Sequence, residues 1–324
     1  MKYYFGYLRD KKELLTVTSG GFCTAIANHI IANRGIVYGK SYSDNFRSIR
    51  NTRVATSGEV ESLKGSKYIY CQEPLPVENI IHDLGRGEVL FIGLPCEVAA
   101  LKKTLQVREV DVGNLITVDL ICHGPTSPEI AKEFLDSLEK GYHSKIIWMT
   151  VRYKKGAWRP PYLYAKFENG KEYIKPFYQT DYGIAFLHYI RKQCYECKFK
   201  GEKHVADITV GDGWGISQSS SFFNNFGVST ILTRTTKADA VLYALDGFDF
   251  IETTENDALA NNRRYYFPSE RTEKCVRFEK DYSKFGLHRA CLNTLTTKEK
   301  ILRCLPKCIK AILKKAKSVL RRRL

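Results

Sequence analysis

Hydrophobic and polar positions near the start of the chain follow a strand, turn and helix rhythm. Residues 14–39 predict a short strand, a turn at Gly20 and Gly21, an apolar helix that ends near Gly35, and a second strand ending at Gly39. The pattern is that of a β-α-β unit, so we expect an α/β fold.

Two apolar runs further along repeat this plan. Residues 89–92 and 115–121 read as buried strands, each followed by a tight turn and a helical pattern. Ser127 is the expected N-cap of the second helix, with Pro128 at its first position. We therefore expect a mixed or parallel sheet flanked by helices.

The later part of the chain changes in character. Residues 146–177 alternate aromatic and basic side chains and are broken by Trp158 and two prolines, which predicts an irregular aromatic-rich insertion of hairpins. A helical pattern over residues 182–192 leads to a strand over residues 207–210 and a glycine-rich turn over residues 211–215.

No repeat or low-complexity linker divides the body of the chain. We expect one domain over residues 1–250, with an N-terminal part at about 14–85 and a C-terminal part at about 88–250. Residues 251–297 then form a C-terminal extension, and residues 298–324 form a basic tail.

Composition limits the classes of protein that fit. A chain of 324 residues with 44% hydrophobic residues can bury a full core. No run approaches the ~18 apolar residues of a membrane span, and the start lacks a signal-peptide core, so we expect a cytoplasmic protein. The last 27 residues hold +10 of the formal charge of +16, which leaves the body too weakly basic to favour nucleic-acid binding.

The basic tail has an amphipathic pattern. Apolar residues recur at helical spacing from about Pro306 onward, namely Leu305, Ile309, Ile312, Leu313, Ala316, Leu320 and Leu324. One interpretation is a basic amphipathic helix that attaches residues 298–324 to the inner face of the cytoplasmic membrane through anionic lipids. The alternative is a solvated basic end that packs its apolar stripe on the body.

Ten cysteines without a secretion signal indicate thiolate chemistry or metal binding. Cys96 and Cys122 each follow a predicted strand, where functional groups of open α/β sheets gather, while Cys194 and Cys197 form a C-x-x-C motif. Together they form a complete ligand set for one iron-sulfur cluster. The alternatives are a zinc knuckle, a redox dithiol at Cys194 and Cys197, or small buried residues.

Several segments carry a family resemblance. They are TSGGFCTAIA, GSKYIYCQ, VLFIGLPCEVAALK, VDLICHGPTSP, KKGAW, RKQCYECKF and DITVGDGWGI, in this order over residues 15–216. This series resembles the coenzyme F-420 hydrogenase/dehydrogenase beta-subunit family. Family membership implies a flavoprotein that binds FAD beside a 4Fe-4S cluster and passes electrons to a second carrier or substrate. The family's cluster cysteines match Cys96, Cys122, Cys194 and Cys197.

The chain also departs from the family pattern. Many members begin with a ferredoxin-like run of cysteines, and the first 22 residues here contain none. The last turn has glycine at position 213, where an aromatic residue is more usual. Short bacterial relatives of this form resemble proteins of polysaccharide assembly, so the resemblance implies a sugar or another small molecule as substrate, and coenzyme F-420 or another carrier as electron acceptor.

The resemblance also gives candidate cofactor residues. Ser19, Gly20 and Gly21 precede a helix whose N-terminus can hold the FAD pyrophosphate, although a plain turn explains them equally simply. Ser66 and Lys67 are candidates for contacts with the flavin ring, with Lys67 stabilising its reduced form.

Four further residues follow from the strand ends. His123 is a candidate proton donor beside a cluster cysteine, and a buried structural histidine is its simpler interpretation. Asp207, Asp212 and Trp214 are candidates for holding the ribityl or ribose hydroxyls and packing on a ring, and Asp212 is also a common turn residue.

These observations predict an iron-sulfur flavoprotein oxidoreductase that exchanges electrons between an external donor protein or reduced carrier and an organic substrate. A second hypothesis is a non-catalytic assembly factor of a membrane-associated glycan machinery, in which the cluster acts as a structural staple.

Overall fold

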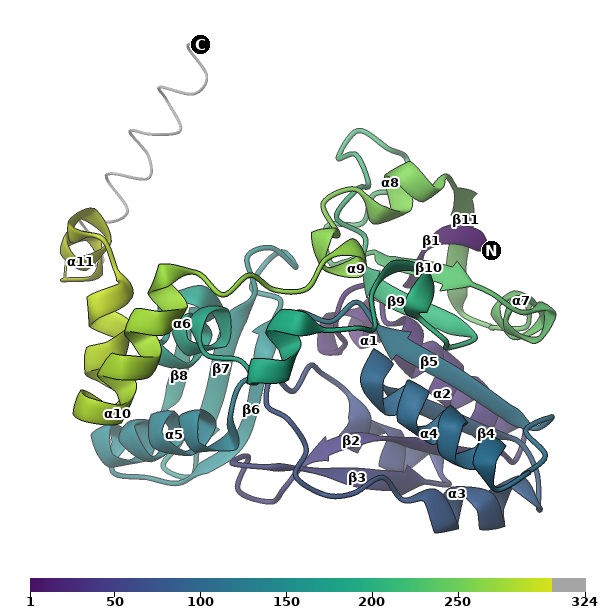
Figure 1. Cartoon of the computed structure of the whole chain (residues 1–324). Coiled ribbons are helices and arrows are strands. Elements are labelled where there is room, and N and C mark those ends of the chain that lie inside the picture. The colour runs from purple at the N-terminus through teal and green to yellow at the C-terminus, as the bar shows by residue number, and fades with distance from the viewer. Residues whose placement is uncertain (305–324) are drawn as a thin grey trace. The chain divides into compact units, whose positions relative to one another are not determined.

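The computed structural model describes residues 1–304, which fall into two compact units. The first is Met1–Glu270, and the second begins at Arg271. Figure 1 shows the chain with its strands and most of its helices in the first unit. This unit ends beyond residue 250 because the strand Phe248–Thr253 and two short helices after it still belong to it.

An eight-stranded mixed sheet forms the centre of the first unit. Its strand order is β11-β1-β10-β9-β5-β4-β2-β3. The neighbours among β9, β5, β4 and β2 pair in parallel, and every other neighbouring pair is antiparallel. The strands are β1 (Lys2–Leu8), β2 (Ile36–Tyr42), β3 (Ile49–Val54), β4 (Val89–Gly93), β5 (Leu115–Leu120), β9 (Ile208–Asp212), β10 (Ser229–Thr233) and β11 (Phe248–Thr253). The predicted α/β class and mixed sheet are confirmed.

Helices cover both faces of this sheet. They include α1 (Lys11–Thr16), α2 (Phe22–Ala32), α3 (Val77–Leu84), α4 (Pro95–Val107) and α7 (Thr236–Tyr243), and the 3-10 helix η1 (Ser57–Leu63) packs beside α2. Neighbouring residues of a strand point to opposite faces, and β4 shows the result. Leu90 packs with residues of α2 and α7, whereas Val89 and Phe91 pack with residues of α3 and α4.

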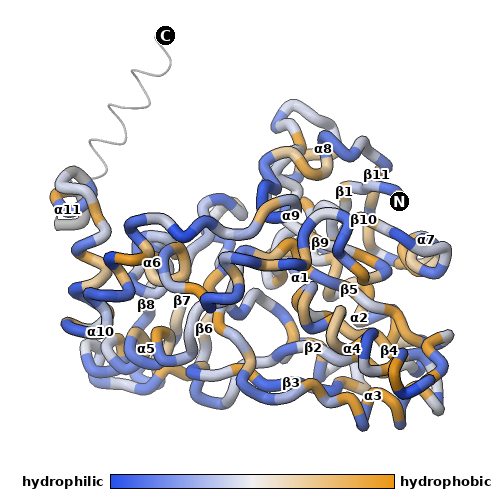
Figure 2. The backbone as a smooth tube through the Cα atoms, in the orientation of Figure 1, coloured by the Kyte–Doolittle hydropathy of each residue, from blue (hydrophilic) through white to orange (hydrophobic). Residues whose placement is uncertain are grey.

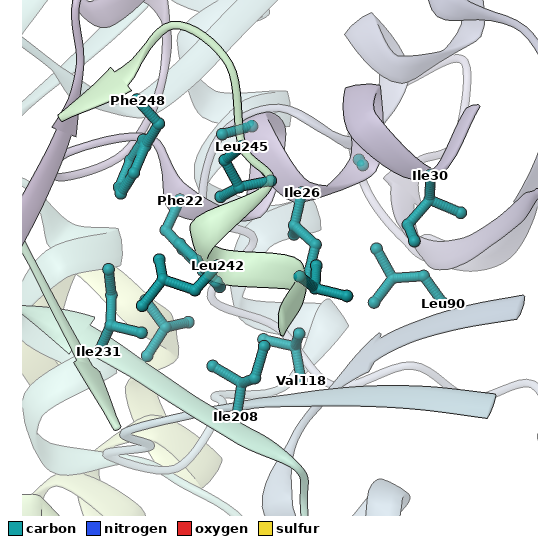
Figure 3. Close-up of a cluster of buried hydrophobic side chains, with 14 of the residues drawn as sticks. Phe22, Ile26, Ile30, Leu90, Val118, Ile208, Ile231, Leu242, Leu245 and Phe248 are labelled. Carbon is teal, nitrogen blue, oxygen red and sulfur yellow. The ribbon is translucent and has the colours of Figure 1, made fainter. Parts of the chain in front are cut away.

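The core between the sheet and α2 is apolar throughout. Phe22, Ile26 and Ile30 recur at four-residue steps and face the strands, as Figure 3 shows. They meet Leu90 and Val118 of the parallel strands. Figure 2 shows hydrophobic stretches of backbone along α3, α4 and β4, and others around α5 and α6.

One predicted element near the start is wrong. The segment before Gly20 was expected to be a strand, but α1 occupies residues 11–16 and a loop follows it. The Asp10 side chain caps this helix by accepting a hydrogen bond from the Lys12 N–H at 2.8 Å, and this cap outweighs the short apolar run. The strand that pairs in the sheet is β1, which lies before it.

The aromatic insertion forms a second sheet, with β7 between β6 and β8. Its strands are β6 (Ile146–Tyr153), β7 (Tyr162–Phe167) and β8 (Glu172–Pro176), and all pairs are antiparallel. The neighbouring helices are α5 (Pro128–Tyr142) and α6 (Asp181–His188), with the 3-10 turns η2 (Phe177–Gln179), η3 (Lys192–Glu196) and η4 (Gly201–Lys203). The Ser127 side chain caps α5 as predicted, accepting from the Glu129 N–H at 3.2 Å.

Short helices complete the two units. The helices α8 (Glu255–Leu259) and α9 (Arg263–Tyr266) end the first unit, and the second contains α10 (Glu273–Thr294) and α11 (Thr297–Cys304). Gly286 interrupts α10 with a φ of 77°. No helix within the described part of the chain is both long and apolar enough to cross a membrane. Most of the predicted basic amphipathic tail lies outside the described residues.

Candidate active site

Two of the predicted cluster cysteines follow neighbouring strands. β4 and β5 pair in parallel, with Gly93 opposite Asp119. Cys96 lies in the first turn of α4, and Cys122 follows the end of β5. The two thiols therefore emerge at the same edge of the sheet, as predicted from parallel strands.

The C-x-x-C segment is held beside Cys122 by the backbone. Thr126 forms an isolated antiparallel bridge with Ile190, just before that segment. A Cβ atom added to Gly124 would lie 3.0 Å from the Cβ of Cys194, so only glycine allows this close approach. The Gly124 N–H also donates to the Cys122 Sγ at 3.3 Å.

The four thiols interact electrostatically. The pKa of Cys96 is raised to about 11, mainly because surrounding protein atoms displace water from the thiol. Glu97, Cys194 and Cys197 make smaller contributions. Burial raises the pKa of Cys122 to about 12, and Cys194 and Cys96 add to that increase. None of the four forms a disulfide. The protein alone thus disfavours the thiolates of Cys96 and Cys122, and a bound cation would reverse this preference.

The spacing of these thiols bears on what they can hold. Among residues 1–304, no group of three or more His, Cys, Asp or Glu side chains is arranged to hold a metal ion. An iron-sulfur cluster contains several iron and sulfide atoms and is bulkier than one ion, so its cysteine ligands stand farther apart. The four thiols are free and interact electrostatically, so they are available for metal or redox chemistry.

Lys200 is a residue of this region that the sequence interpretation missed. Its Nζ donates to the carbonyl of Cys122 at 2.6 Å and to the carbonyl of Arg264 at 2.7 Å. The ammonium lowers the pKa of Cys122, against the effect of burial. A basic residue three positions after Cys197 was the available signal, but nothing in the sequence linked it to Cys122.

A cavity of about 430 Å³ in the first unit is lined in part by Cys122, and its volume is typical of small-molecule sites. Most of the predicted site residues line it, namely Ser19, Gly21, Ser66, Lys67, Cys122, His123, Asp212 and Trp214. They come from distant parts of the sequence, so the fold brings the predicted flavin residues to one place beside a predicted cluster ligand.

The N-terminus of α2 forms part of the cavity wall. Gly21 is the N-cap of this helix with a φ of 85°, and residues 21–24 all line the cavity. The Thr18 and Ser66 hydroxyls lie 3.2 Å apart, which joins this loop to the segment around Lys67. Backbone N–H groups at a helix N-terminus attract phosphate groups.

Of the residues predicted to contact the flavin, two do not line the cavity. A Cβ on Gly20 would lie 2.1 Å from the carbonyl oxygen of Gly6, so this glycine permits close packing of the loop on β1. Asp207 is buried at the other end of β9 from Asp212, where it accepts from the Thr117 N–H at 2.9 Å and from the Thr117 hydroxyl at 2.6 Å. Both residues have clear structural functions.

The two predicted catalytic residues have defined surroundings. The Lys67 ammonium donates to the carbonyls of Leu63 and Lys64 at 2.8 and 2.9 Å, at the end of η1. Burial lowers the pKa of Lys67 to about 7. The His123 ring packs at a tilt against Phe186 with ring centroids 4.7 Å apart, and burial lowers the pKa of His123 to about 4.

Arg152 and Asp212 form a buried ion pair at the cavity. The guanidinium donates to both carboxylate oxygens, at 3.1 and 2.6 Å, and to the Tyr68 hydroxyl at 3.2 Å. The pair links β6 of the small sheet to β9 of the large sheet. Arg152 was missed because the aromatic and basic alternation of its segment gives no indication of its partner.

Trp214 belongs to an aromatic stack at the cavity wall. Its ring lies 5.1 Å from that of Trp158 at an angle of 13°. The Arg159 guanidinium lies 4.1 Å from each ring centroid and donates to the Gly213 carbonyl at 3.2 Å. The stack fixes the position of Trp214.

The mixed sheet carries four interacting cysteines, one of which lines a cavity of small-molecule size. The chain belongs to the family described as coenzyme F420 hydrogenase/dehydrogenase, C terminus of the beta subunit, whose model matches residues 87–258. The protein is therefore an oxidoreductase of the hydrogenase/dehydrogenase beta-subunit type, and the expected family membership is confirmed.

A solved structure shares the fold. It belongs to the F420-reducing [NiFe] hydrogenase complex from Methanosarcina barkeri, studied by xenon derivatization, with a TM-score of 0.55 and 19% sequence identity. The match covers 78% of this chain and 81% of the other. No curated protein matches the chain.

Proposed function

We propose that the protein is an iron-sulfur flavoprotein that carries electrons between a donor, a 4Fe-4S cluster, FAD and an organic substrate or carrier. The observation that supports it is the electrostatic interaction of Cys96, Cys194 and Cys197 with one another and with Cys122, which lines the cavity. When bound, the cluster would supply one-electron steps and the flavin hydride-level chemistry.

The residues of the chain would have separate tasks. The α2 N-terminus, with Thr18 and Ser66, would bind the FAD phosphates and polar groups. Arg152 would hold the Asp212 side chain in place to accept hydrogen bonds from cofactor hydroxyls. Trp214 and the other ring-bearing side chains of the wall would exclude water from the reacting centre.

The substrate remains a prediction from the family resemblance. A sugar or sugar nucleotide of polysaccharide assembly, or a deazaflavin carrier such as coenzyme F-420, fits the same redox chemistry. A protein donor would deliver electrons on the side of the cysteines. The family relationship to redox subunits supports a partner protein without identifying it.

The test is anaerobic purification followed by iron, acid-labile sulfide and flavin assays. We expect about four irons and four sulfides for each chain and one FAD. Replacing Cys96, Cys122, Cys194 or Cys197 singly with serine should remove the cluster. Cys71→Ser is the matched control, because Cys71 is half-buried and lines the cavity but lies outside the group of four.

Two results would contradict the proposal. One is stoichiometric zinc without sulfide in the wild-type protein. The other is full iron content in all four single variants. Absence of FAD from protein with a complete cluster would contradict the flavin assignment alone.

A further inference from the structure

The cavity contains more positive than negative charge. Its charged lining residues are Lys40, Lys64, Lys67, Arg152 and Arg264, with the acids Glu97 and Asp212. Three of the cations have acidic partners. Lys40 lies 3.1 Å from Glu97, Lys64 pairs with Glu61 and Glu13, and Arg152 pairs with Asp212. Lys67 and Arg264 therefore remain without a carboxylate partner among the described residues.

These two cations differ in their free hydrogen-bond donors. The Lys67 ammonium already donates to three carbonyls at the end of η1, which use all of its N–H groups. The Arg264 guanidinium donates only through Nη1, to the Pro268 carbonyl at 2.5 Å. In the described part of the chain, its remaining N–H groups have no partner. Burial and Arg263 lower the pKa of Arg264, and Glu270 offsets only part of this effect.

The fold fixes Arg264 close to the cysteines. Lys200 donates to the carbonyls of both Arg264 and Cys122, so one side chain connects the two segments. Asn262 donates to the Asp212 carbonyl at 3.0 Å, which holds the same segment against the turn after β9. Arg264 also interacts electrostatically with His123, another cavity residue.

The segment that carries Arg264 lies beyond the family match. The match ends at residue 258, and residues 261, 262 and 264 add two amides and one guanidinium to the wall. The cofactor regions of the cavity come from earlier parts of the chain. A recognition group added by this later segment is therefore suited to a ligand other than the shared cofactors.

We propose that Arg264 binds an oxyanion, a phosphate or carboxylate group, of the organic substrate or carrier. A guanidinium binds such groups through two parallel hydrogen bonds, and the cavity offers no carboxylate in the described residues that neutralises it. The redox role of this ligand depends on the function proposed above. The site thus selects anionic substrates and holds them beside Cys122 and His123.

The experiment uses the full chain saturated with FAD, titrated calorimetrically with inorganic phosphate in one arm and acetate in the other. Arg264→Gln should weaken binding of the preferred anion by about tenfold, and Arg264→Lys should fall between it and wild type. The anion that wild-type protein binds more tightly shows whether the ligand group is a phosphate or a carboxylate. Arg263→Gln is the matched control, because Arg263 is exposed and pairs with Glu270.

A second measurement covers the case in which Arg264→Gln does not fold. Phosphate or acetate should then protect Arg264 of the wild-type protein from phenylglyoxal, read by mass spectrometry, with Arg263 as the unprotected reference. Equal affinities of wild type and Arg264→Gln, or equal modification of Arg264 with and without anion, would overturn the inference.

The outcome is separable from the proposed function. If the protein contains neither iron nor FAD, the redox proposal fails, while the same comparison on the cofactor-free chain still decides the oxyanion site. If cofactors are complete and anion binding is unchanged in Arg264→Gln, only the oxyanion site fails.

Discussion

At the scale of single residues, Lys154 connects the small sheet to α1 and to the loop that precedes α2. Its Nζ donates to the Leu14 carbonyl at 2.5 Å and to the Ser19 carbonyl at 2.7 Å. The side chain is buried, and burial, with Arg152 nearby, lowers the pKa of Lys154 to about 7. A buried amine that donates to two backbone carbonyls fixes the position of the segments that carry them.

Lys154→Met should therefore weaken FAD binding. The methionine fills a similar volume but leaves the carbonyls of Leu14 and Ser19 without donors, so the loop before α2 loses its support. We expect the dissociation constant for FAD to rise about tenfold, measured by fluorescence titration. Lys155→Met, at an exposed neighbouring position, should leave it unchanged, and an unchanged constant in Lys154→Met would remove this positioning role.

At the scale of elements, the Arg152 and Asp212 pair joins the two sheets. Both side chains are largely buried, with 8% and 15% exposed, so loss of one partner leaves the other charge without compensation. Arg152→Met should lower the free energy of unfolding by about 3–5 kcal/mol, measured by urea denaturation. Arg9→Met breaks the exposed pair with Asp249 and should cost less than about 1 kcal/mol.

The outcome for the double variant distinguishes the pair from general packing. Adding Asp212→Leu to Arg152→Met should recover part of the lost stability, because it removes the orphaned buried carboxylate. If the stability losses of Arg152→Met and Asp212→Leu simply add up in the double variant, the two residues are not coupled.

A second contact between elements gives the protein a pH dependence. Asp83 of α3 accepts from Arg53 of β3 at 2.6 Å and from the Tyr38 hydroxyl of β2 at 2.6 Å. Mainly because of the Arg53 hydrogen bond, the pKa of Asp83 falls from 3.8 to about 2. Since the folded pKa is the lower one, this contact stabilises the fold fully above pH 3.8, and the contribution is lost as the pH falls through about 2.

Asp83→Asn should thus remove a pH-dependent part of the stability. Arg53 is partly exposed, so solvent screening reduces the expected contribution to about 1–2 kcal/mol. The difference in unfolding free energy between wild type and variant should be constant above about pH 4 and shrink toward about pH 2. Asp44→Asn is the control, because Asp44 is almost fully exposed. A difference that stays constant down to about pH 2 would exclude this linkage.

At the scale of the whole molecule, the charge of the chain is unevenly distributed. Residues 298–324 carry eleven lysines and arginines against one glutamate. The amphipathic spacing in this segment predicts contact with anionic membranes. Residues 305–324 lie outside the described part of the chain, so this contact stays a prediction. The first unit, by comparison, contains both sheets and the cavity.

Liposome flotation tests the membrane prediction. The full chain should float with anionic vesicles and be released by high salt, because each basic residue contributes on the order of 1 kcal/mol near an anionic surface. A chain that ends at Thr297 should remain at the bottom of the gradient with the same melting temperature. Equal flotation of the two chains, or equal binding to neutral vesicles, would exclude an electrostatic anchor.

The sequence by itself determined the central elements and the candidate cysteines. Apolar runs bounded by turns were sufficient for β4, β5 and β9, because buried parallel strands need continuous hydrophobic residues. The positions of Cys96 and Cys122 after two such strands predicted their common edge. The N-terminal strand β1 was missed, and α1 was taken for a strand, since a short apolar run fits both elements.

Only the tertiary structure decided which polar residues line the cavity. Gly20 and Asp207 read as cofactor residues in the sequence, but packing on Gly6 and hydrogen bonds to Thr117 occupy them. The carbonyls that Lys154 and Lys200 contact lie far away along the chain, so no local pattern revealed these hydrogen bonds. The sequence also could not show that Arg264 lines the cavity. Local patterns encode burial and turns, whereas the pairing of charges depends on which distant segments the fold brings together.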